Sequence, residues 1–292
     1  MANQVPVLDY GESTYEQDFW LAGQRAYEDA AERWALPRLL PPSGGRLADI
    51  GAGFGRLADL YRGHEQVILL DYSPDLLRDA RLRLAAHPPL TVAANYYNIP
   101  LADGACDTVV MVRALHHAAD VPAVLAELRR ILRPGGILVL EHANKRHAKA
   151  LLRHWLGLGP NPSTLEPYEF APLNFAFHPA YIRRELAAAG FEVEAERDVS
   201  TFRLALLKRL VPTRLLAGLD GLLQRPLAPL HLSPSIFLRC RATGDAGTPP
   251  PERPLFRCPR CRTADLREEP DRLVCRHCGT PWLVIDGIHR FR

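Results

Sequence analysis

The sequence contains no run of 18 or more apolar residues, and its first residues, 1–6, hold no basic region followed by an apolar core. The first absence argues against a membrane-spanning helix, and the second against a secretory signal peptide. The net charge is only +3, which gives no general case for nucleic-acid binding. A cytoplasmic enzyme is therefore the expectation.

Cysteine is scarce, with six residues in 292, but four of the six form two C-x-x-C pairs that are 13 residues apart. Four thiolates at this spacing can close a tetrahedron around one zinc ion. Because four ligands leave no coordination position open, the predicted zinc is structural rather than catalytic. The predicted ligands are Cys258, Cys261, Cys275 and Cys278, and His277 between them is not expected to bind the metal.

A glycine-rich stretch follows the first predicted strand. It reads Asp49-Ile-Gly-Ala-Gly-Phe-Gly55, with glycine at three alternate positions. Without a Cβ the backbone can turn sharply and approach a ligand closely, and a helix that opens after the loop would offer free N–H groups to a negative charge. A dinucleotide-binding loop would place its third small residue where Arg56 stands, so the pattern favours a different small cofactor.

An acidic residue, Asp71, ends the next apolar strand and is followed by Tyr72-Ser-Pro. Together with the glycine loop, this pattern resembles motif I of the class I S-adenosylmethionine-dependent methyltransferases. The resemblance implies S-adenosyl-L-methionine as the methyl donor, with the Asp71 carboxylate on the ribose hydroxyls. The cofactor-binding residues that it implies are Asp49, Gly51, Ala52, Gly53, Gly55, Asp71, Tyr72, Asn95, Tyr96 and Arg113.

Three of these residues follow later strands. The family commonly has an acidic residue where Asn95 stands, but an amide oxygen can still accept a hydrogen bond from the adenine amino group. Tyr96 could flank the adenine face or belong to the core. The segment 112–141, with His-His-x-x-Asp and Leu-Arg-Pro-Gly-Gly, resembles the ubiquinone-biosynthesis-type branch, in which the backbone around Arg113 faces the methionine portion. The resemblance covers roughly residues 40–198.

The pattern of apolar runs predicts a Rossmann-like α/β fold, in which seven strands are flanked by helices and the last two strands pair antiparallel. The expected strands are 46–50, 67–70, 90–94, 108–112, 137–141, 191–198 and 235–241, and the expected helices are 74–86, 121–132 and 179–189. The predicted domains are an N-terminal helical lid (1–42), a methyltransferase domain (43–242), a linker (243–255) and a zinc ribbon (256–292). The ribbon is too small for a hydrophobic core of its own.

Additional segments surround this minimal fold. Aromatic residues at helical spacing in 1–42 could cover the cofactor cleft or pack against the sheet, and Arg25 and Tyr27 are the residues to test as cofactor contacts. Insertions at about 145–178 and 200–232 could shape a substrate pocket, because loops beyond the carboxyl ends of strands carry specificity. The leucine-rich second insertion could equally be a pair of packing helices.

Methyl transfer from a sulfonium is an in-line displacement, so positioning supplies much of the rate. A hydroxyl or acidic carbon acceptor would still need a base to remove its proton. The preferred candidates are His117 and Glu141, although a paired histidine after a strand can also be structural. Other titratable side chains near strand ends are His116, His142 and His178.

The acceptor is less well determined. An Asn-Pro-Pro-Tyr signature is missing, which lowers the odds of adenine or glutamine methylation. The central motifs and the leucine-rich insertion favour a small molecule or lipid-like compound. However, segment 256–291 resembles small zinc-ribbon proteins that activate tRNA, rRNA and translation-factor methyltransferases, and 145–153 and 203–225 are basic. RNA or a translation-related protein is therefore the alternative acceptor, and a non-catalytic S-adenosylmethionine-binding scaffold is a second alternative.

Overall fold

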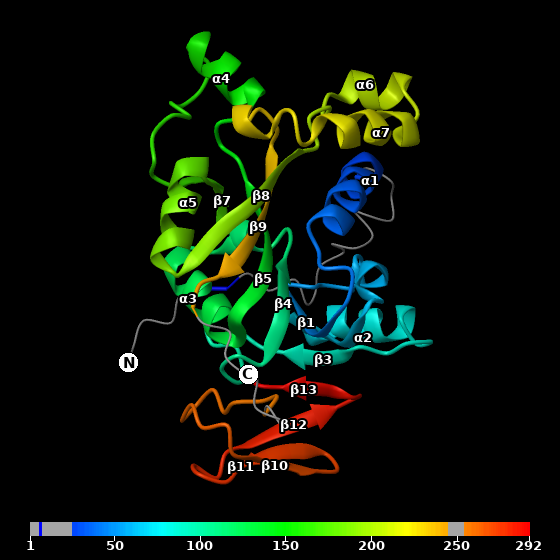
Figure 1. Cartoon of the computed structure of the whole chain (residues 1–292), viewed down its shortest axis with the longest axis vertical. Coiled ribbons are helices and arrows are strands. Elements are labelled where there is room, and N and C mark those ends of the chain that lie inside the picture. Colours follow the sequence, from blue (N-terminus) through cyan, green and yellow to red (C-terminus); the bar gives the residue numbers. More distant parts are fainter. Residues whose placement is uncertain (1–5, 8–24, 245–253) are drawn as a thin grey trace.

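The computed structural model describes residues 6–7, 25–244 and 254–292 (Figure 1). A central sheet contains the seven predicted strands in the order β3-β2-β1-β4-β5-β9-β8. Every neighbouring pair from β3 to β5 is parallel, whereas β9 runs antiparallel to both β5 and β8. The strands are β1 (Gly44–Ile50), β2 (His64–Asp71), β3 (Leu90–Ala93), β4 (Cys106–Met111), β5 (Leu132–Ala143), β8 (Phe191–Val199) and β9 (Ser235–Ala242).

Helices cover both faces of the sheet. Alternate side chains of β1 enter opposite cores, with Ala48 and Ile50 in one and Leu47 in the other, as expected for a strand that is buried on both faces. The first core includes α3 (Val121–Ile131) and α5 (Pro179–Ala188), and the second includes α1 (Ala26–Ala35), α2 (Pro74–Arg83) and α7 (Thr213–Leu223). The predicted Rossmann-like α/β fold is confirmed.

Local signals fix where several helices begin. Ser73 and Asp120 cap α2 and α3, because their side chains accept hydrogen bonds from Leu76 N and Ala123 N at 3.3 and 3.0 Å. Pro74 then occupies the first turn of α2, where a missing N–H costs nothing. No helix in the described part of the chain has both the length and the apolar character needed to span a bilayer.

Several predicted element boundaries differ from the structure, and three of the differences change how a segment is described. The stretch after Gly55 forms turns and a short 3-10 helix, η3 (Ala58–Tyr61), rather than the expected α-helix. Helix α2 ends at Arg83, three residues before the predicted end. Strand β5 begins at Leu132, which pairs with Cys106, so the Arg-Pro-Gly-Gly segment belongs to an irregular strand start.

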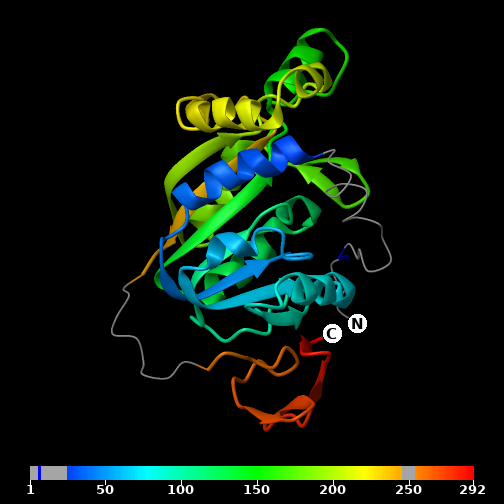
Figure 2. The same cartoon turned by 90° about the vertical axis from the view of Figure 1, so that its right-hand side faces the viewer.

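Two insertions lie at the end of the molecule that is farthest from the zinc-ribbon segment (Figures 1 and 2). The first contains α4 (Ala148–Trp155) and a hairpin of β6 (Tyr168–Ala171) and β7 (Asn174–Ala176). The second contains α6 (Ala205–Leu210), α7 and the 3-10 helix η5 (Ala228–Leu230). Helix α7 packs on α1, with Gln224 Nε2 donating to Ala31 O at 2.9 Å. The remaining 3-10 helices are η2 (Leu36–Arg38) and η4 (Leu115–His117).

The C-terminal segment extends the same sheet. It forms β10 (Leu266–Glu269), β11 (Arg272–Cys275), β12 (Pro281–Ile285) and β13 (Ile288–Arg290), and the sheet thereby gains four strands in the order β10-β11-β12-β13-β3. A tight Asp-Gly turn joins β12 to β13, with positive φ of 54° and 71° at its two residues, as a two-residue hairpin requires. Strand β13 pairs parallel with β3, and Ile288 lies opposite Thr91.

The ribbon obtains its apolar interior from the larger domain. Leu273 and Phe291 are buried in one of the two cores of that domain, and Ile288 is buried in the other. Residues 245–253 of the predicted linker lie outside the described residues. From Leu255 onward the chain is bound to the domain, because Leu255 O accepts from Ala102 N and Arg257 N donates to Pro100 O, each at 2.9 Å.

Replacing Ile288 by alanine should test this shared core. Ile288 is fully buried, so Ile288→Ala removes apolar contacts and should lower the free energy of unfolding by about 2–5 kcal/mol in urea denaturation. Ile285→Ala is the matched control, because Ile285 is 37% exposed and its truncation should cost less than about 1 kcal/mol. Equal losses in the two variants would show that β13 does not bury Ile288 against the domain.

Candidate cofactor and metal sites

The glycine loop after β1 packs closely against the exit of β4. Gly51 has φ of +76°, and a Cβ on it would lie 2.4 Å from the Cβ of Ala114, so no other residue fits there. Gly53, with φ of +54°, directs its N–H to Asp71 Oδ2 at 2.8 Å. The loop is therefore bound both to the exit of β4 and to the end of β2.

Asp71 connects the glycine loop to the start of α2. Its Oδ1 accepts from Ser73 N at 2.9 Å, while its Oδ2 accepts from Gly53 N. Each carboxylate oxygen has a second lone-pair direction, so the group can still accept hydrogen bonds from a diol. The side chain borders a hollow at the carboxyl ends of the strands.

Most of the predicted cofactor residues gather around two adjoining hollows. The first, of about 60 Å³, is lined by Gly51, Gly53, Leu70, Asp71, Tyr72, Leu76, Tyr96, Arg113, Ala114 and His117. The second, of about 50 Å³, is lined by Asp49, Gly51, Ala52, Gly53, Phe54, Arg56, Leu57, Val112 and Arg113. The sequence analysis missed the apolar lining residues, which read as ordinary strand and helix positions.

Two predicted cofactor residues line neither hollow. Gly55, with φ of +70°, packs against α2, where an added Cβ would lie 3.1–3.3 Å from Leu69, Leu84 and Ala80. The Asn95 Oδ1 accepts from Tyr97 N at 2.8 Å, so this amide caps its own turn.

A buried carboxylate, Glu32 of α1, joins two arginines at the site. Its Oε2 accepts from Arg56 Nη2 at 2.6 Å, and its Oε1 accepts from Arg113 Nε at 2.7 Å. Burial by itself would raise the pKa of Glu32, but the charges and hydrogen bonds of Arg113 and Arg56 outweigh it and lower the pKa to about 2. Arg56 also pairs with Asp29, so α1 is fixed to the glycine loop.

The backbone of Arg113 adopts a left-handed conformation, with φ of 58°. Its N–H donates to Glu141 Oε2 at 3.0 Å, and Glu141 also accepts a hydrogen bond from the Ser235 hydroxyl. Glu141 is buried and lines neither hollow. The geometry thus makes Glu141 a support for the Arg113 backbone.

His117 borders the first hollow from η4. Its Nδ1 lies 3.0 Å from Leu173 O, an acceptor, so Nδ1 carries the proton and Nε2 carries the lone pair. Burial lowers the pKa of His117, which favours the neutral imidazole at pH 7. This tautomer and charge state are those of a general base.

Asp49 lies beneath the glycine loop and is 3% exposed. Its Oδ2 accepts from the Tyr61 hydroxyl at 2.9 Å. Burial dominates here and raises the pKa of Asp49 to about 7, so a cationic ligand nearby would favour the ionised carboxylate.

Tyr27 lines neither hollow. Its hydroxyl donates to Asp220 Oδ1 at 3.0 Å and accepts from Phe202 N at 2.9 Å, in a buried contact between α1 and α7. Arg25, at the start of α1, also lines neither hollow. Three of the other aromatic residues at helical spacing in 1–42, Tyr15, Phe19 and Trp20, lie outside the described residues.

The remaining histidines have local contacts. His116 and His117 lie ring against ring, with centroids 3.9 Å apart. His142 is buried, which lowers its pKa to about 4, and His178 Nδ1 caps α5 by accepting from Ala180 N at 3.1 Å. Neither His142 nor His178 lines the hollows.

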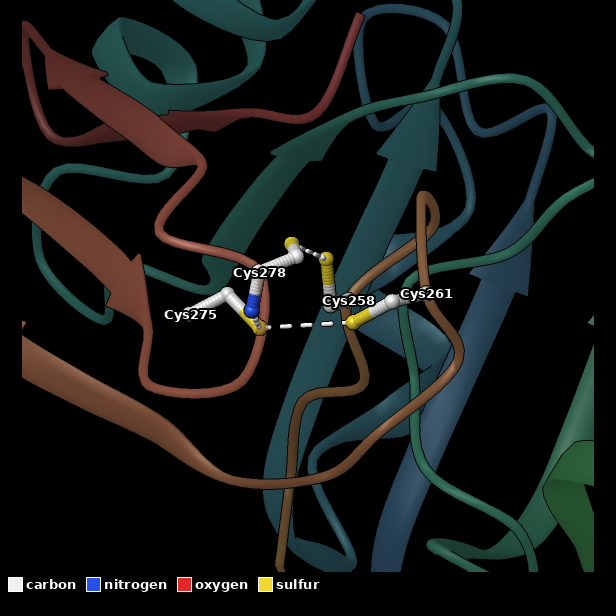
Figure 3. Close-up of side chains that lie close together, drawn as sticks. All are labelled: Cys258, Cys261, Cys275 and Cys278. Atoms are coloured by element: carbon white, nitrogen blue, oxygen red, sulfur yellow. Dashed lines mark hydrogen bonds between the residues drawn. The ribbon is translucent and has the colours of Figure 1, made fainter.

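The four predicted zinc ligands meet at one point of the ribbon (Figure 3). All four Sγ atoms lie within 4.8 Å of one another, with Cys258 and Cys278 at 3.7 Å and Cys261 and Cys275 at 3.4 Å. A tetrahedral zinc with Zn–S bonds of about 2.3 Å would separate its sulfurs by about 3.8 Å. The donor set therefore fits zinc.

The backbone of each C-x-x-C pair is shaped for this geometry. Arg262 and Gly279 directly follow the second cysteine of their pairs and have φ of 64° and 70°. Their N–H groups donate hydrogen bonds to the carbonyl oxygens of Cys258 and Cys275, at 2.8 and 2.9 Å respectively. His277 is exposed and does not join the thiol cluster.

Sequence comparison agrees with the geometry of the glycine-loop site. Residues 48–140 match the family profile described as Methyltransferase domain. The match runs from β1 to β5 and includes the lining residues of both hollows. Residues 48–140 therefore resemble a methyltransferase domain.

Curated relatives match parts of the chain. Malonyl-[acyl-carrier protein] O-methyltransferase from Serratia marcescens is 37% identical over 33% of this chain and 37% of its own length. A Mycolicibacterium smegmatis protein named as an S-adenosylmethionine-dependent methyltransferase is 29% identical over 61% of this chain and 62% of its own length. The chain thus spans less than two thirds of either relative.

A solved structure with the same fold is the complex between a Haloferax volcanii methyltransferase activator and a methyltransferase. It aligns with a TM-score of 0.56 and 19% identity, over 79% of this chain and 96% of that chain. This likeness shows the fold, and it agrees with the Rossmann-like architecture of the methyltransferase domain.

Removing the Glu32 carboxylate should destabilise the domain strongly. Glu32→Gln leaves the mostly buried Arg56 and Arg113 without their shared anion, and we expect a loss of about 3–5 kcal/mol in urea denaturation at pH 7. Because the folded-state pKa is lowered, this stabilisation is present above about pH 4.5 and is lost as the pH falls towards 2.

The difference in free energy of unfolding between the wild type and Glu32→Gln should therefore decrease below pH 4.5, by at most about 1.4 kcal/mol per pH unit. Asp29→Asn is the matched control, because Asp29 also pairs with Arg56 but is 27% exposed, and it should cost less than Glu32→Gln. A difference that is unchanged between pH 7 and pH 3 would contradict the assigned ion pairs.

Proposed function

We propose that the chain is an S-adenosylmethionine-dependent methyltransferase that acts on a small-molecule or lipid-like acceptor. The observation that carries the proposal is the Asp71 carboxylate, which is bonded to the glycine loop and borders the hollow at the carboxyl ends of the strands. In open α/β sheets, ligands bind at this edge. The methyltransferase-domain match over the same residues supports the proposal.

The residues around the hollows fit the parts of the cofactor. Asp71 would accept the ribose hydroxyls, and Tyr72 and Tyr96 would flank the adenine. Asp49, the Arg113 backbone and the loop residues Gly51, Ala52 and Gly53 would surround the methionine portion. Since ligand pockets usually measure about 300–1,000 Å³, the hollows must widen when the cofactor binds.

The bound cofactor would supply an electrophilic methyl group on a sulfonium. The protein would then need to orient the acceptor and, for a hydroxyl or a protonated carboxyl, to take up its proton. His117 is the proposed base, because its Nε2 carries the lone pair and the ring borders the hollow. Glu141 was the other candidate, and we propose that it acts by holding the Arg113 backbone.

The name of the Serratia relative gives malonyl-[acyl-carrier protein] as its acceptor and oxygen as the methylated atom. This name favours a small-molecule acceptor for the present chain over RNA or a translation-related protein. RNA binding that weakens steeply with salt would favour the rival acceptor class. A chain that binds the cofactor but methylates no acceptor would be a scaffold.

We further propose that the ribbon binds one structural zinc through Cys258, Cys261, Cys275 and Cys278. In the Haloferax complex, an activator and a methyltransferase occur together. In the present chain the ribbon extends the methyltransferase sheet within one polypeptide. Its proposed role is to complete the β3 edge and to support the loops that follow β2 and β3.

Calorimetry with S-adenosylmethionine tests the cofactor assignment. The wild type should bind, and Asp71→Ala should lose at least tenfold in affinity, because the ribose acceptor and the Gly53 anchor are both removed. Asp75→Ala is the matched control, since Asp75 is an exposed carboxylate on the neighbouring α2, and it should bind like the wild type. Absence of binding by the wild type would defeat the proposed function, and unchanged affinity in Asp71→Ala would defeat the ribose assignment.

Elemental analysis of the purified chain should find one zinc per molecule. Cys275→Ser should lose the metal and lower the melting temperature, because the ribbon relies on the metal and on the shared core. His277→Ala should keep the zinc, since this exposed side chain lies between two ligands without joining them. Full zinc content in Cys275→Ser would overturn the assigned ligand set.

A further inference from the structure

A larger cavity lies beyond the carboxyl end of β5, outside the cofactor hollows. It measures about 440 Å³, and its walls come from the exit of β5, α4 and the β6–β7 hairpin. Its basic lining residues are Lys145, His147, Lys149, Arg153 and Arg203. None of the described residues that line it is acidic, so the cavity would attract an anion.

Arg203 is the residue that points to a ligand. Its Nε and Nη2 are buried and donate a hydrogen bond to no group in the described residues. The nearest anion, Glu28, lies 3.9 Å from the Nε, and both of its oxygens already accept from Lys208 at 2.9 and 3.0 Å. A buried guanidinium with open donors is costly, and a phosphate or carboxylate that accepts two of its N–H groups would remove that cost.

The cavity is next to the cofactor hollows. Arg203 interacts electrostatically with Arg113, which lines both hollows, and burial together with this repulsion lowers the pKa of Arg203 to about 10. Strand β7 of the cavity wall packs on η4, which carries His117. An acceptor held in the cavity would therefore lie near the proposed methyl donor and base.

The lining also includes two exposed aromatic side chains. Tyr168 and Phe170 line the cavity and remain 43% and 55% exposed. Helix α4 contributes Lys149, Ala150 and Arg153 to the lining, whereas its exposed Leu152 and Trp155 do not line the cavity. A basic lining with exposed aromatic side chains matches a ligand that has an anionic group and a hydrocarbon portion.

We propose that this cavity binds the acceptor and that the acceptor is an anionic amphiphile. A phosphate or carboxylate group binds Arg203, with Lys149 and Arg153 in the same lining, and the hydrocarbon portion lies along Tyr168 and Phe170 of β6. The proposal rests on the proposed methyltransferase function and gives the chemical class of its acceptor. The leucine-rich insertion contributes Arg203 to the cavity lining.

Calorimetry of the full chain with four probes tests the proposal. The probes are octyl phosphate, octanoate, inorganic phosphate and the neutral octyl glucoside. Octyl phosphate or octanoate should bind at least tenfold more tightly than octyl glucoside, and the tighter of the two identifies the anionic group. Inorganic phosphate should bind at least fivefold more weakly than octyl phosphate. Equal affinity for octyl phosphate and octyl glucoside would overturn the anion site, and equal affinity for the two phosphates would overturn the role of Tyr168 and Phe170.

Three variants locate the binding. Arg203→Gln should lower the affinity for the preferred anionic probe at least tenfold, whereas Arg209→Gln, which removes an exposed arginine of the same segment, should change it less than twofold. Lys149→Gln/Arg153→Gln changes only exposed lining residues, so it provides a second test if Arg203→Gln folds poorly. Equal losses in the Arg203 and Arg209 variants would indicate general surface attraction and overturn the site.

S-adenosylmethionine binding by the same wild-type sample separates the two proposals. Cofactor binding without a preference for the anionic probes would support the proposed function and overturn the proposed acceptor class. Absence of cofactor binding would overturn the proposed function, whichever probe binds in the cavity.

Discussion

The candidate cofactor site depends on the ion pairs that the buried carboxylate of Glu32 makes with Arg56 and Arg113. Glu32 lies on α1, but it holds Arg56 after the glycine loop and Arg113 after β4, so three separate parts of the chain meet at one anion. Arg113 then occupies a left-handed conformation that directs its N–H to Glu141. Because a buried charge without a partner is costly, each of these groups keeps the others in place.

The strands of the sheet were predictable because they are apolar runs bounded by glycine, proline or charged residues. Strands that are buried on both faces read as continuous apolar runs, without alternating polar residues. The Asp49, Asp71 and C-x-x-C positions were also predictable, since fixed spacing determines their geometry. Glu32 was not predictable, because on a helix with charges on several sides it reads as a solvent-exposed residue. The contact of Tyr27 was not predictable for a different reason, because its partner Asp220 lies 193 residues away in the sequence.

The cavity beside β5 also could not be predicted from the sequence. The basic residues of 145–153 and the arginine at position 203 were visible as two separate charged segments, and their charge suggested nucleic acid as readily as any other anion. The structure brings these residues around one space, while it turns leucines such as Leu206 and Leu222 outward. Which side of an insertion faces the domain depends on tertiary packing, which local periodicity in a short helix does not determine.

The parallel pairing of β13 with β3 also sets an order of events during synthesis. Residues 90–93 leave the ribosome long before residues 288–290, so the methyltransferase sheet can assemble while its β3 edge has no neighbour. An unpaired edge strand invites association with other chains, and pairing between segments so distant in sequence forms late. The nascent chain therefore passes through a period in which the β3 edge is open to association with other chains, and this period ends when β13 pairs with it.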